Sequence, residues 1–167
     1  LYGQAGAIRN CRSDVTVHGG QNVGGIVGYV AGGYSSATKE ITGCVNTGAV
    51  SSSSHNAGGI VGYIYGQVTV DSCYNRGSCT SGSYRAGGIT AYLASSSAAV
   101  KNCYTTGETK VAYGSDSHAV IGNKSSGTVE NCYYLSGLTA DTSAAAKTAD
   151  ELKALAPTLG NAFLAAP

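Results

Sequence analysis

The six cysteines are the side chains of this 167-residue sequence best suited to metal binding or nucleophilic chemistry. A zinc site needs cysteines separated by about two to four residues, and a nucleophilic cysteine needs a histidine partner in an electropositive setting. The closest pair, Cys73 and Cys79, is spaced too widely, and His18, His55 and His118 lie in segments without a neighbouring cysteine. We therefore expect no metal site, no cofactor and no catalytic cysteine.

Five of the cysteines instead mark a repeat. They close the related segments Ile8–Cys11, Ile41–Cys44, Val70–Cys73, Val100–Cys103 and Val129–Cys132, with spacings of 33, 29, 30 and 29 residues. A second segment recurs between them, as Gly24–Tyr29, Gly58–Tyr63 and Gly87–Tyr92, with a divergent copy at His118–Asn123. Units of this length bury an apolar face by stacking on one another. We predict a buried structural ladder, one thiol per unit, made of Cys11, Cys44, Cys73, Cys103 and Cys132.

The redox state of this ladder has two interpretations. We favour free thiols packed in a core, with Cys79 as a further core residue because it aligns with Val50 and Thr109. The alternative is disulfide pairing between neighbouring units, since the spacing of stacked strands lies within the range that disulfides bridge. Cys79 would then make the number of cysteines even.

The composition of the repeat predicts strands rather than helices. Each unit is rich in glycine, Val, Ile, Thr, Tyr and Ser, which form helices poorly and suit short strands separated by turns. We predict an all-β fold for residues 1–140, a right-handed parallel β-helix-like solenoid of about five rungs with two or three strands in each. The Asn, Gly or Ser before each cysteine should form a corner, because these residues tolerate left-handed backbone.

The remaining residues, 141–167, predict a connection and a short helical cap. Thr148 and Glu151 fit a capping box, and Pro157 limits the helix to about 149–156. Leu152, Leu155, Leu159 and Phe163 follow at roughly helical spacing, so we expect the leucines to pack over the last rung.

Charged residues are few and do not indicate an enzyme. A glycosidase or lyase on a solenoid would need carboxylates or basic groups that converge on one face. Asp71, Lys101 and Glu130 align on successive units, and their alternating sign predicts a solvated row. Asp116–His118 could suggest a hydrolase fragment, but no nucleophile-elbow motif accompanies it. A net charge of +1 and the absence of a long apolar run argue against nucleic-acid binding and membrane insertion.

Tyrosine rows are the strongest binding candidates. Tyr74, Tyr104 and Tyr133 follow cysteines on three successive units and should stack outward as a strip for sugar rings or a protein partner. Tyr29, Tyr63 and Tyr92 form a second row. The alternative for both rows is stacking between rungs that only stabilises the sheet.

The motifs Gly58–Tyr63 and Val70–Gly77 resemble the GLUG-motif repeat, and Val100–Gly107 matches the second half of that repeat fully. The resemblance covers about residues 8–138, and Lys147–Lys153 is similar to the segment that commonly follows such repeats. It implies a bacterial protein that is secreted or attached to the cell surface, such as an adhesin-like protein or the non-catalytic part of an IgA-directed metallopeptidase. The sequence begins within a unit and without an initiator Met or signal peptide, so we expect a mature fragment or excised domain.

These observations predict a non-catalytic structural or adhesive module, extracellular or on the bacterial surface, that presents a rigid face to a host protein or glycan. One alternative is a carbohydrate-active enzyme or its carbohydrate-binding accessory domain. Another is a fibre subunit that self-associates end to end through the open ends of the solenoid.

Overall fold

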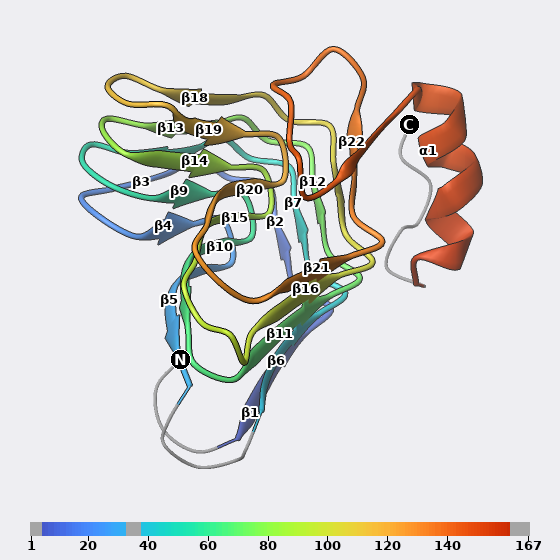
Figure 1. The fold of residues 1–167 in the computed structure, drawn as a ribbon, viewed down its shortest axis with the longest axis horizontal. Coiled ribbons are helices and arrows are strands. Elements are labelled where there is room, and N and C mark those ends of the chain that lie inside the picture. Colours follow the sequence, from blue (N-terminus) through green and yellow to red (C-terminus); the bar gives the residue numbers. More distant parts are fainter. Residues whose placement is uncertain (1–4, 33–37, 161–167) are drawn as a thin grey trace.

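The computed structural model describes residues 5–32 and 38–160 and shows an all-β solenoid (Figure 1). The chain winds through four complete turns, here called rungs, and begins a fifth. Each complete rung has five short strands, more than the two or three expected from sequence, because two-residue strands occur beside the longer ones. A short helix follows the coil.

The strands of rung 1 are β1 (Gly6–Arg9), β2 (Arg12–Ser13), β3 (Val17–Gly19), β4 (Val23–Gly24) and β5 (Val27–Ala31). Rung 2 contains β6 (Lys39–Thr42), β7 (Val45–Asn46), β8 (Val50–Ser52), β9 (Ala57–Gly58) and β10 (Val61–Tyr65). Rung 3 contains β11 (Val68–Asp71), β12 (Tyr74–Asn75), β13 (Cys79–Ser81), β14 (Arg85–Gly87) and β15 (Thr90–Leu93). Rung 4 contains β16 (Ala99–Lys101), β17 (Tyr104–Thr105), β18 (Thr109–Val111), β19 (Asp116–His118) and β20 (Ile121–Lys124). The fifth rung begins with β21 (Thr128–Glu130) and β22 (Tyr133–Leu135), and β23 (Ala145–Lys147) follows.

Corresponding strands of successive rungs form five parallel sheets. We name them by their first strands: sheet A begins with β1, sheet B with β2, sheet C with β3, sheet D with β4 and sheet E with β5. The register places like residues beside each other, for example Val70 beside Val100 and Tyr63 beside Tyr92. The predicted solenoid is therefore present, and its repeat is the structural rung.

The core lies inside the coil, where the stacked apolar residues meet. Ile41, Val70 and Val100 from sheet A are fully buried and share one cluster with Ile60 and Ile89. A second, smaller core lies between sheets C and D around Val50, Ala57 and Cys79. Sheets C and D thus form a two-layer arm that projects from the main coil (Figure 1).

The corner before each cysteine has the predicted left-handed backbone. The residues there, one per rung, have φ between 50° and 64°: Asn10, Gly43, Ser72, Asn102 and Asn131. The corner turns the following cysteine inward, where strict strand alternation would have placed it outward. Asn102 Nδ2 donates to Asp71 Oδ1 at 2.9 Å, and Asn131 Nδ2 donates to Asn102 Oδ1 at 3.2 Å.

Close approach of stacked backbones explains two of the glycine positions. A Cβ on Gly77 would lie 1.8 Å from the carbonyl oxygen of Gly48 in the rung before. A Cβ on Gly59, in the Gly-Gly motif, would lie 2.3 Å from the side-chain amide carbon of Asn75. Asn75 is fully buried and accepts a hydrogen bond from Asn46 Nδ2 at 2.8 Å. The motif therefore makes room for an internal asparagine ladder.

The C-terminal end of the coil is partly closed by the connection after β22. Asp141 Oδ2 accepts hydrogen bonds from the backbone N–H groups of Val120 (2.9 Å) and Ile121 (2.7 Å). One rung earlier, the equivalent groups of Ile89 and Thr90 both donate to the carbonyl of Val120. The Asp141 carboxylate therefore takes the place of the carbonyl that a further rung would supply.

The helix α1 (Ala149–Leu155) begins at the predicted capping box and continues into the 3₁₀ helix η1 (Ala156–Thr158). Its position differs from the expectation that it packs over the last rung. It lies beside the coil, against the outer face of sheet B (Figure 1). The reason is that β23 pairs with β22 and extends sheet B, which directs the chain outward along that sheet. Phe163 lies outside the described residues, among which no helix is long and apolar enough to cross a membrane.

The corner geometry generates a prediction for Asn102. The Asn102→Ala variant loses both side-chain hydrogen bonds. Alanine also tolerates left-handed backbone less well than asparagine, so we expect the free energy of unfolding to fall by about 2 kcal/mol. The Asn102→Gly variant loses only the hydrogen bonds and should lose about half as much. Urea unfolding measures both values, and equal losses would show that the left-handed corner carries no strain.

Candidate functional site

The cysteine corner contains free thiols. Cys44, Cys73, Cys103 and Cys132 are buried at the same corner of successive rungs, whereas Cys11, in the first rung, is exposed and differs from the expected buried ladder. The contacts include a hydrogen bond from the Cys73 N–H group to Cys103 Sγ at 3.4 Å. None of the six cysteines is in a disulfide.

Burial makes these thiols poor nucleophiles. It raises the pKa of Cys103 well above the usual range of a thiol, and it raises the pKa of Cys79, a buried thiol outside the ladder, to about 12. Hydrogen bonding with Cys103 lowers the pKa of Cys73 and of Cys132, so for these two thiols burial acts by excluding reagents. The four buried ladder thiols are at most 4% exposed, so a substrate carbonyl or a metal ion cannot reach them. The geometry therefore assigns the ladder a packing role.

The row predicted as a binding strip is covered by the helix. Tyr74 and Tyr104 stack with ring centroids 4.1 Å apart, but they are only 5% and 3% exposed. Leu152, Ala156 and Leu159 of the helical segment are buried with them, and Tyr133 packs against the same cluster. The row does face outward from the coil, but in this structure it is not a surface open to a ligand. The apolar face of α1 was predicted from its leucines, whereas the surface that it covers was not.

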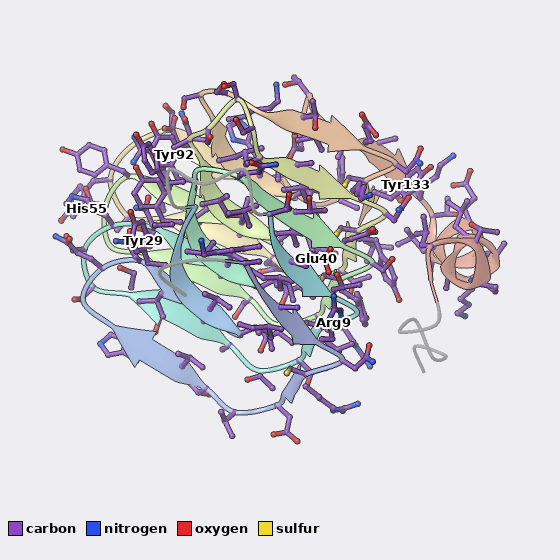
Figure 2. All side chains as sticks on the ribbon, turned by 90° about the horizontal axis from the view of Figure 1, so that it is seen from below. Arg9, Tyr29, Glu40, His55, Tyr92 and Tyr133 are labelled. Atoms are coloured by element: carbon purple, nitrogen blue, oxygen red, sulfur yellow. The ribbon has the colours of Figure 1, made fainter. Side chains whose placement is uncertain are left out.

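The second tyrosine row lies on the opposite flank of the molecule. Tyr29 and Tyr92 lie on the side of the coil away from the helix (Figure 2). The ring centroids of Tyr29 and Tyr63 are 5.1 Å apart, and those of Tyr63 and Tyr92 are 5.0 Å apart. The guanidinium carbon of Arg85 lies 3.9 Å from the centroid of Tyr92. The rings therefore pack mainly against one another, as expected for stacking that stabilises the sheet.

A polar column borders this row at the angle between sheets D and E. Asn56 Nδ2 donates to Asn22 Oδ1 at 2.7 Å, and Arg85 donates through Nη1 to Asn56 Oδ1 at 3.4 Å. Asp116 Oδ2 lies 3.8 Å from Arg85 Nε and accepts from Asn123 Nδ2 at 2.8 Å. This column is not among the features predicted from the sequence. The sequence pattern that could have indicated it is an asparagine directly before Val23 and again before Ala57. In the structure both asparagines have positive φ.

Large exposed side chains gather at the turns that join sheet C to sheet D. We call residues 53–55, 82–84 and 112–115 the turn edge. Tyr84 and Tyr113 are 54% and 77% exposed, and the ring of His55 lies 4.6 Å from that of Tyr84. His55 lies on the same flank as Tyr29 and Tyr92 (Figure 2). Sequence reasoning missed this edge because its tyrosines fall outside the repeated motifs, in turn segments of glycine and serine.

The charged row on sheet A is paired and solvated. Lys101 Nζ lies 3.4 Å from Asp71 Oδ2, and Glu130 is the in-register neighbour of Lys101. Arg9 forms an ion pair with Glu40 nearer the first rung. Each carboxylate in this row faces a cation rather than a second carboxylate, so the row does not provide the paired acids of a glycosidase.

The Asp116–His118 segment does not form a catalytic triad. It lies in one strand, where alternation places Ser117 on the opposite face from its two neighbours. Ser117 Oγ is buried without a hydrogen-bond partner among the described residues, and His118 bonds through Nδ1 to the carbonyl of Gly122 at 2.7 Å. A nucleophile and its base would need to bond each other.

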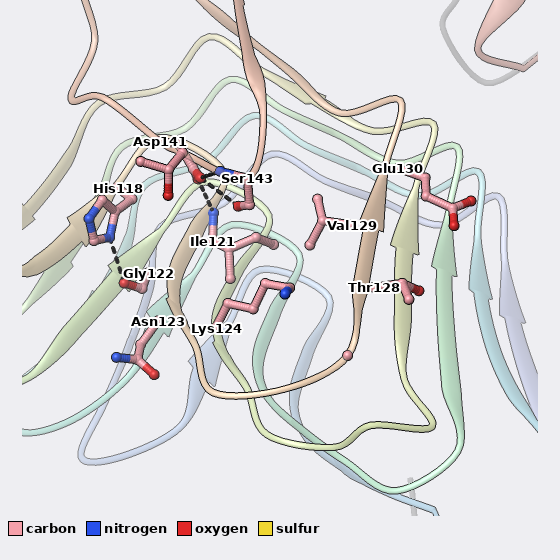
Figure 3. A pocket seen from close by; sticks show the side chains of 12 residues that line it. His118, Ile121, Gly122, Asn123, Lys124, Thr128, Val129, Glu130, Asp141 and Ser143 are labelled. Atoms are coloured by element: carbon pink, nitrogen blue, oxygen red, sulfur yellow. Dashed lines mark hydrogen bonds between the residues drawn. The ribbon is translucent and has the colours of Figure 1, made fainter.

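A cavity of about 770 Å³ opens at the C-terminal mouth of the coil, where a further rung would continue (Figure 3). Ile121 and Val129 form its apolar part, and Lys124 points into it, whereas Glu130 points away (Figure 3). Asp141 at the rim is occupied by the backbone groups of β20 and by Ser143. The charged groups here do not converge on one point, and among residues 5–32 and 38–160 no three metal-ligating side chains are placed to hold an ion.

One solved structure is similar over most of the chain. It is a crystal structure from Bacteroides ovatus, provisionally named an immunoglobulin A1 protease, with a TM-score of 0.76 and 24% sequence identity. The match covers 92% of this chain and 53% of the other, so this chain spans about half the length of that protein. At this identity the likeness shows the β-solenoid fold. No protein-family model and no curated protein matches the sequence.

The thiol geometry predicts selective labelling. With iodoacetamide at pH 8, the folded protein should be alkylated at Cys11, because the other five thiols are buried and burial keeps the Cys79 pKa near 12. After unfolding in urea without reductant, all six should react, as intact mass spectrometry would show. A mass that lacks two additions after unfolding would reveal a disulfide and contradict the free ladder.

The covered tyrosines predict a change in alkaline titration. Burial raises the pKa of Tyr74 and of Tyr104. The Leu152→Ala variant should weaken helix docking by about 2–5 kcal/mol and admit water to both rings, which lowers both pKa values. Absorbance at 295 nm follows the ionisation, and Lys153→Ala, an exposed change on the same helix, is the control. Unchanged titration in the Leu152 variant, with the two rings still ionising late, would show that the helix does not shield them.

Proposed function

We propose that this chain is a non-catalytic structural and adhesive module of a bacterial surface or secreted protein. Its role is to hold a binding face rigidly toward a host protein or glycan. The observation that carries the proposal is that each rung hydrogen-bonds in register to the next, in the turns as well as in the sheets, so surface side chains project from a fixed backbone. A surface ordered before binding loses little conformational entropy when a partner docks.

The resemblance to the GLUG-motif repeat and the likeness to the Bacteroides ovatus protein support this role. That protein is about twice as long as the matched region, so a solenoid of this kind there accompanies further chain. Its name refers to a host immunoglobulin, and we propose a host glycoprotein of that kind as a partner of this chain. An extracellular location follows from the same proposal.

No observation favours the two alternatives over this module. For a carbohydrate-active enzyme, Glu40 and Asp71 are paired with cations, and Glu130 lies in register beside Lys101 rather than beside a second carboxylate. For an end-to-end fibre, part of the C-terminal end is already used, because β23 covers the edge of sheet B and Asp141 takes the N–H groups of Val120 and Ile121.

The test combines binding with a search for turnover. The full chain is immobilised and exposed to immunoglobulin A1, immunoglobulin G, a mucin and a glycan array, and each bound probe is then analysed by mass spectrometry after long incubation. We expect at least one probe to bind and to be recovered intact. Cleavage of a probe that disappears in the His118→Ala or Glu130→Gln variant would assign an enzymatic activity and contradict the proposal.

A further inference from the structure

The core column of sheet E ends in a lysine. Its members from rungs 1 to 3 are fully buried aliphatic residues: Val30, Ile64 and Leu93. Lys124 follows Leu93 in register. Because in-register neighbours of a parallel sheet point to the same side, Lys124 occupies the core position of rung 4, and its side chain points into the cavity at the C-terminal mouth (Figure 3).

The arm formed by sheets C and D shows the same change at the same rung. Cys79 and Ala86 are fully buried in these two sheets, and their in-register neighbours in rung 4 are Thr109 and Ser117. The hydroxyl oxygens of both are buried without a hydrogen-bond partner among residues 5–32 and 38–160. Three core columns therefore change from apolar to polar in the last complete rung.

Rung 4 is also the rung at which three sheets end. The strands β18, β19 and β20 each pair with a strand of rung 3 and are the last strands of sheets C, D and E. The connection after β22 reaches the start of β20 through Asp141. A strand edge without a neighbour presents unpaired N–H and C=O groups, which are a template for pairing with another chain, and natural sheets protect such edges with inward-pointing charges among other features.

Lys124 opposes pairing with a second copy of the chain in either orientation. A copy stacked head to tail in register would place Val30 beside Lys124 and enclose the ammonium group in an apolar column. Copies stacked tail to tail would enclose two ammonium groups in one shared cavity. The first arrangement removes an unpaired charge from water, which is strongly unfavourable, and the second also brings like charges together.

The mouth provides no carboxylate that would compensate for this loss of hydration. Glu130 points away from the cavity (Figure 3), and Asp141 is occupied by backbone N–H groups. Within the described ranges no ion pair involves Lys124. The side chain is exposed in the isolated chain, so its ammonium group is hydrated there and would lose that water only when another copy covered the mouth.

We propose that Lys124, together with Thr109 and Ser117, stops other copies of this chain from continuing the coil at its C-terminal end. The strand β23 protects sheet B by pairing with it, and the three polar side chains protect sheets C, D and E. This role is independent of the proposed function, because it concerns how the module stays separate from its own copies rather than what the module binds.

Sedimentation velocity over a range of protein concentrations tests this role. The wild-type chain should sediment as a monomer. The triple variant Lys124→Leu, Thr109→Val, Ser117→Ala should self-associate about 100-fold more strongly, since pairing would then bury apolar side chains in place of a charge and two hydroxyls. Lys124→Leu alone should show a gain of about tenfold, and it decides the question by the same criteria if the triple variant does not fold.

Two control variants separate the position of the change from its type. Lys124→Glu should stay monomeric, because a charge of either sign resists burial. Lys153→Leu makes the same change on α1, where the side chain is 62% exposed, and should also stay monomeric. Circular dichroism confirms that each variant is folded, and hydrogen exchange shows whether β18, β19 and β20 become protected.

Association of the triple variant with new protection in these three strands supports the proposal. A folded triple variant that remains monomeric overturns it and leaves the protection of this end to β23 and Asp141. Association without new protection in these strands also overturns it, as does equal association of Lys124→Glu or Lys153→Leu, because the position or the charge would then not matter. Wild-type chains that associate through this end would contradict it directly.

Discussion

Each strand of this coil hydrogen-bonds in register to the same strand of the next rung, and this stacking dictates what every column may contain. A side chain lies about 4.8 Å from its counterparts in the rungs above and below. It must therefore pack against them or form hydrogen bonds with them. Tyrosine rings stack, asparagine amides bond each other, and buried thiols pack without charge. Charged residues alternate in sign, as Asp71 and Lys101 do. Where backbones approach most closely, as at Gly77, only glycine fits.

The same constraint explains the C-terminal segment, because a coil that ends leaves unpaired strands and uncovered side chains. Three features of the C-terminal segment satisfy or cover these groups. The Asp141 carboxylate receives two backbone N–H groups that a further rung would have bonded. The strand β23 pairs with β22, and the helix places its leucines over the stacked rings of Tyr74 and Tyr104. The burial of the predicted binding strip is thus a consequence of how the coil ends.

The sequence predicted those features that depend on residue type at a fixed spacing. The repeat, the left-handed corners and the Thr148–Glu151 capping box follow from local backbone preferences and are all present. Five strands per rung could not be predicted, because a pair such as Val45–Asn46 is too short to show alternation. The helix face was predictable from Leu152 and Leu155, but its docking surface depends on where β23 directs the chain. The burial of the row formed by Tyr74 and Tyr104 depended on that same step.

Stacking also indicates where this coil is free to carry specific recognition. Several columns inside the sheets repeat one residue type, as the Tyr29–Tyr63–Tyr92 column does, and their residues report the requirements of the fold more than those of a partner. At the turns between sheets C and D, the backbones still rest on one another while the side chains point past the sheet ends, and their identities change from rung to rung. A repeat fold acquires specificity at such positions without disturbing its core. The exposed Tyr84 and Tyr113 lie there, whereas the regular tyrosine rows serve the coil itself.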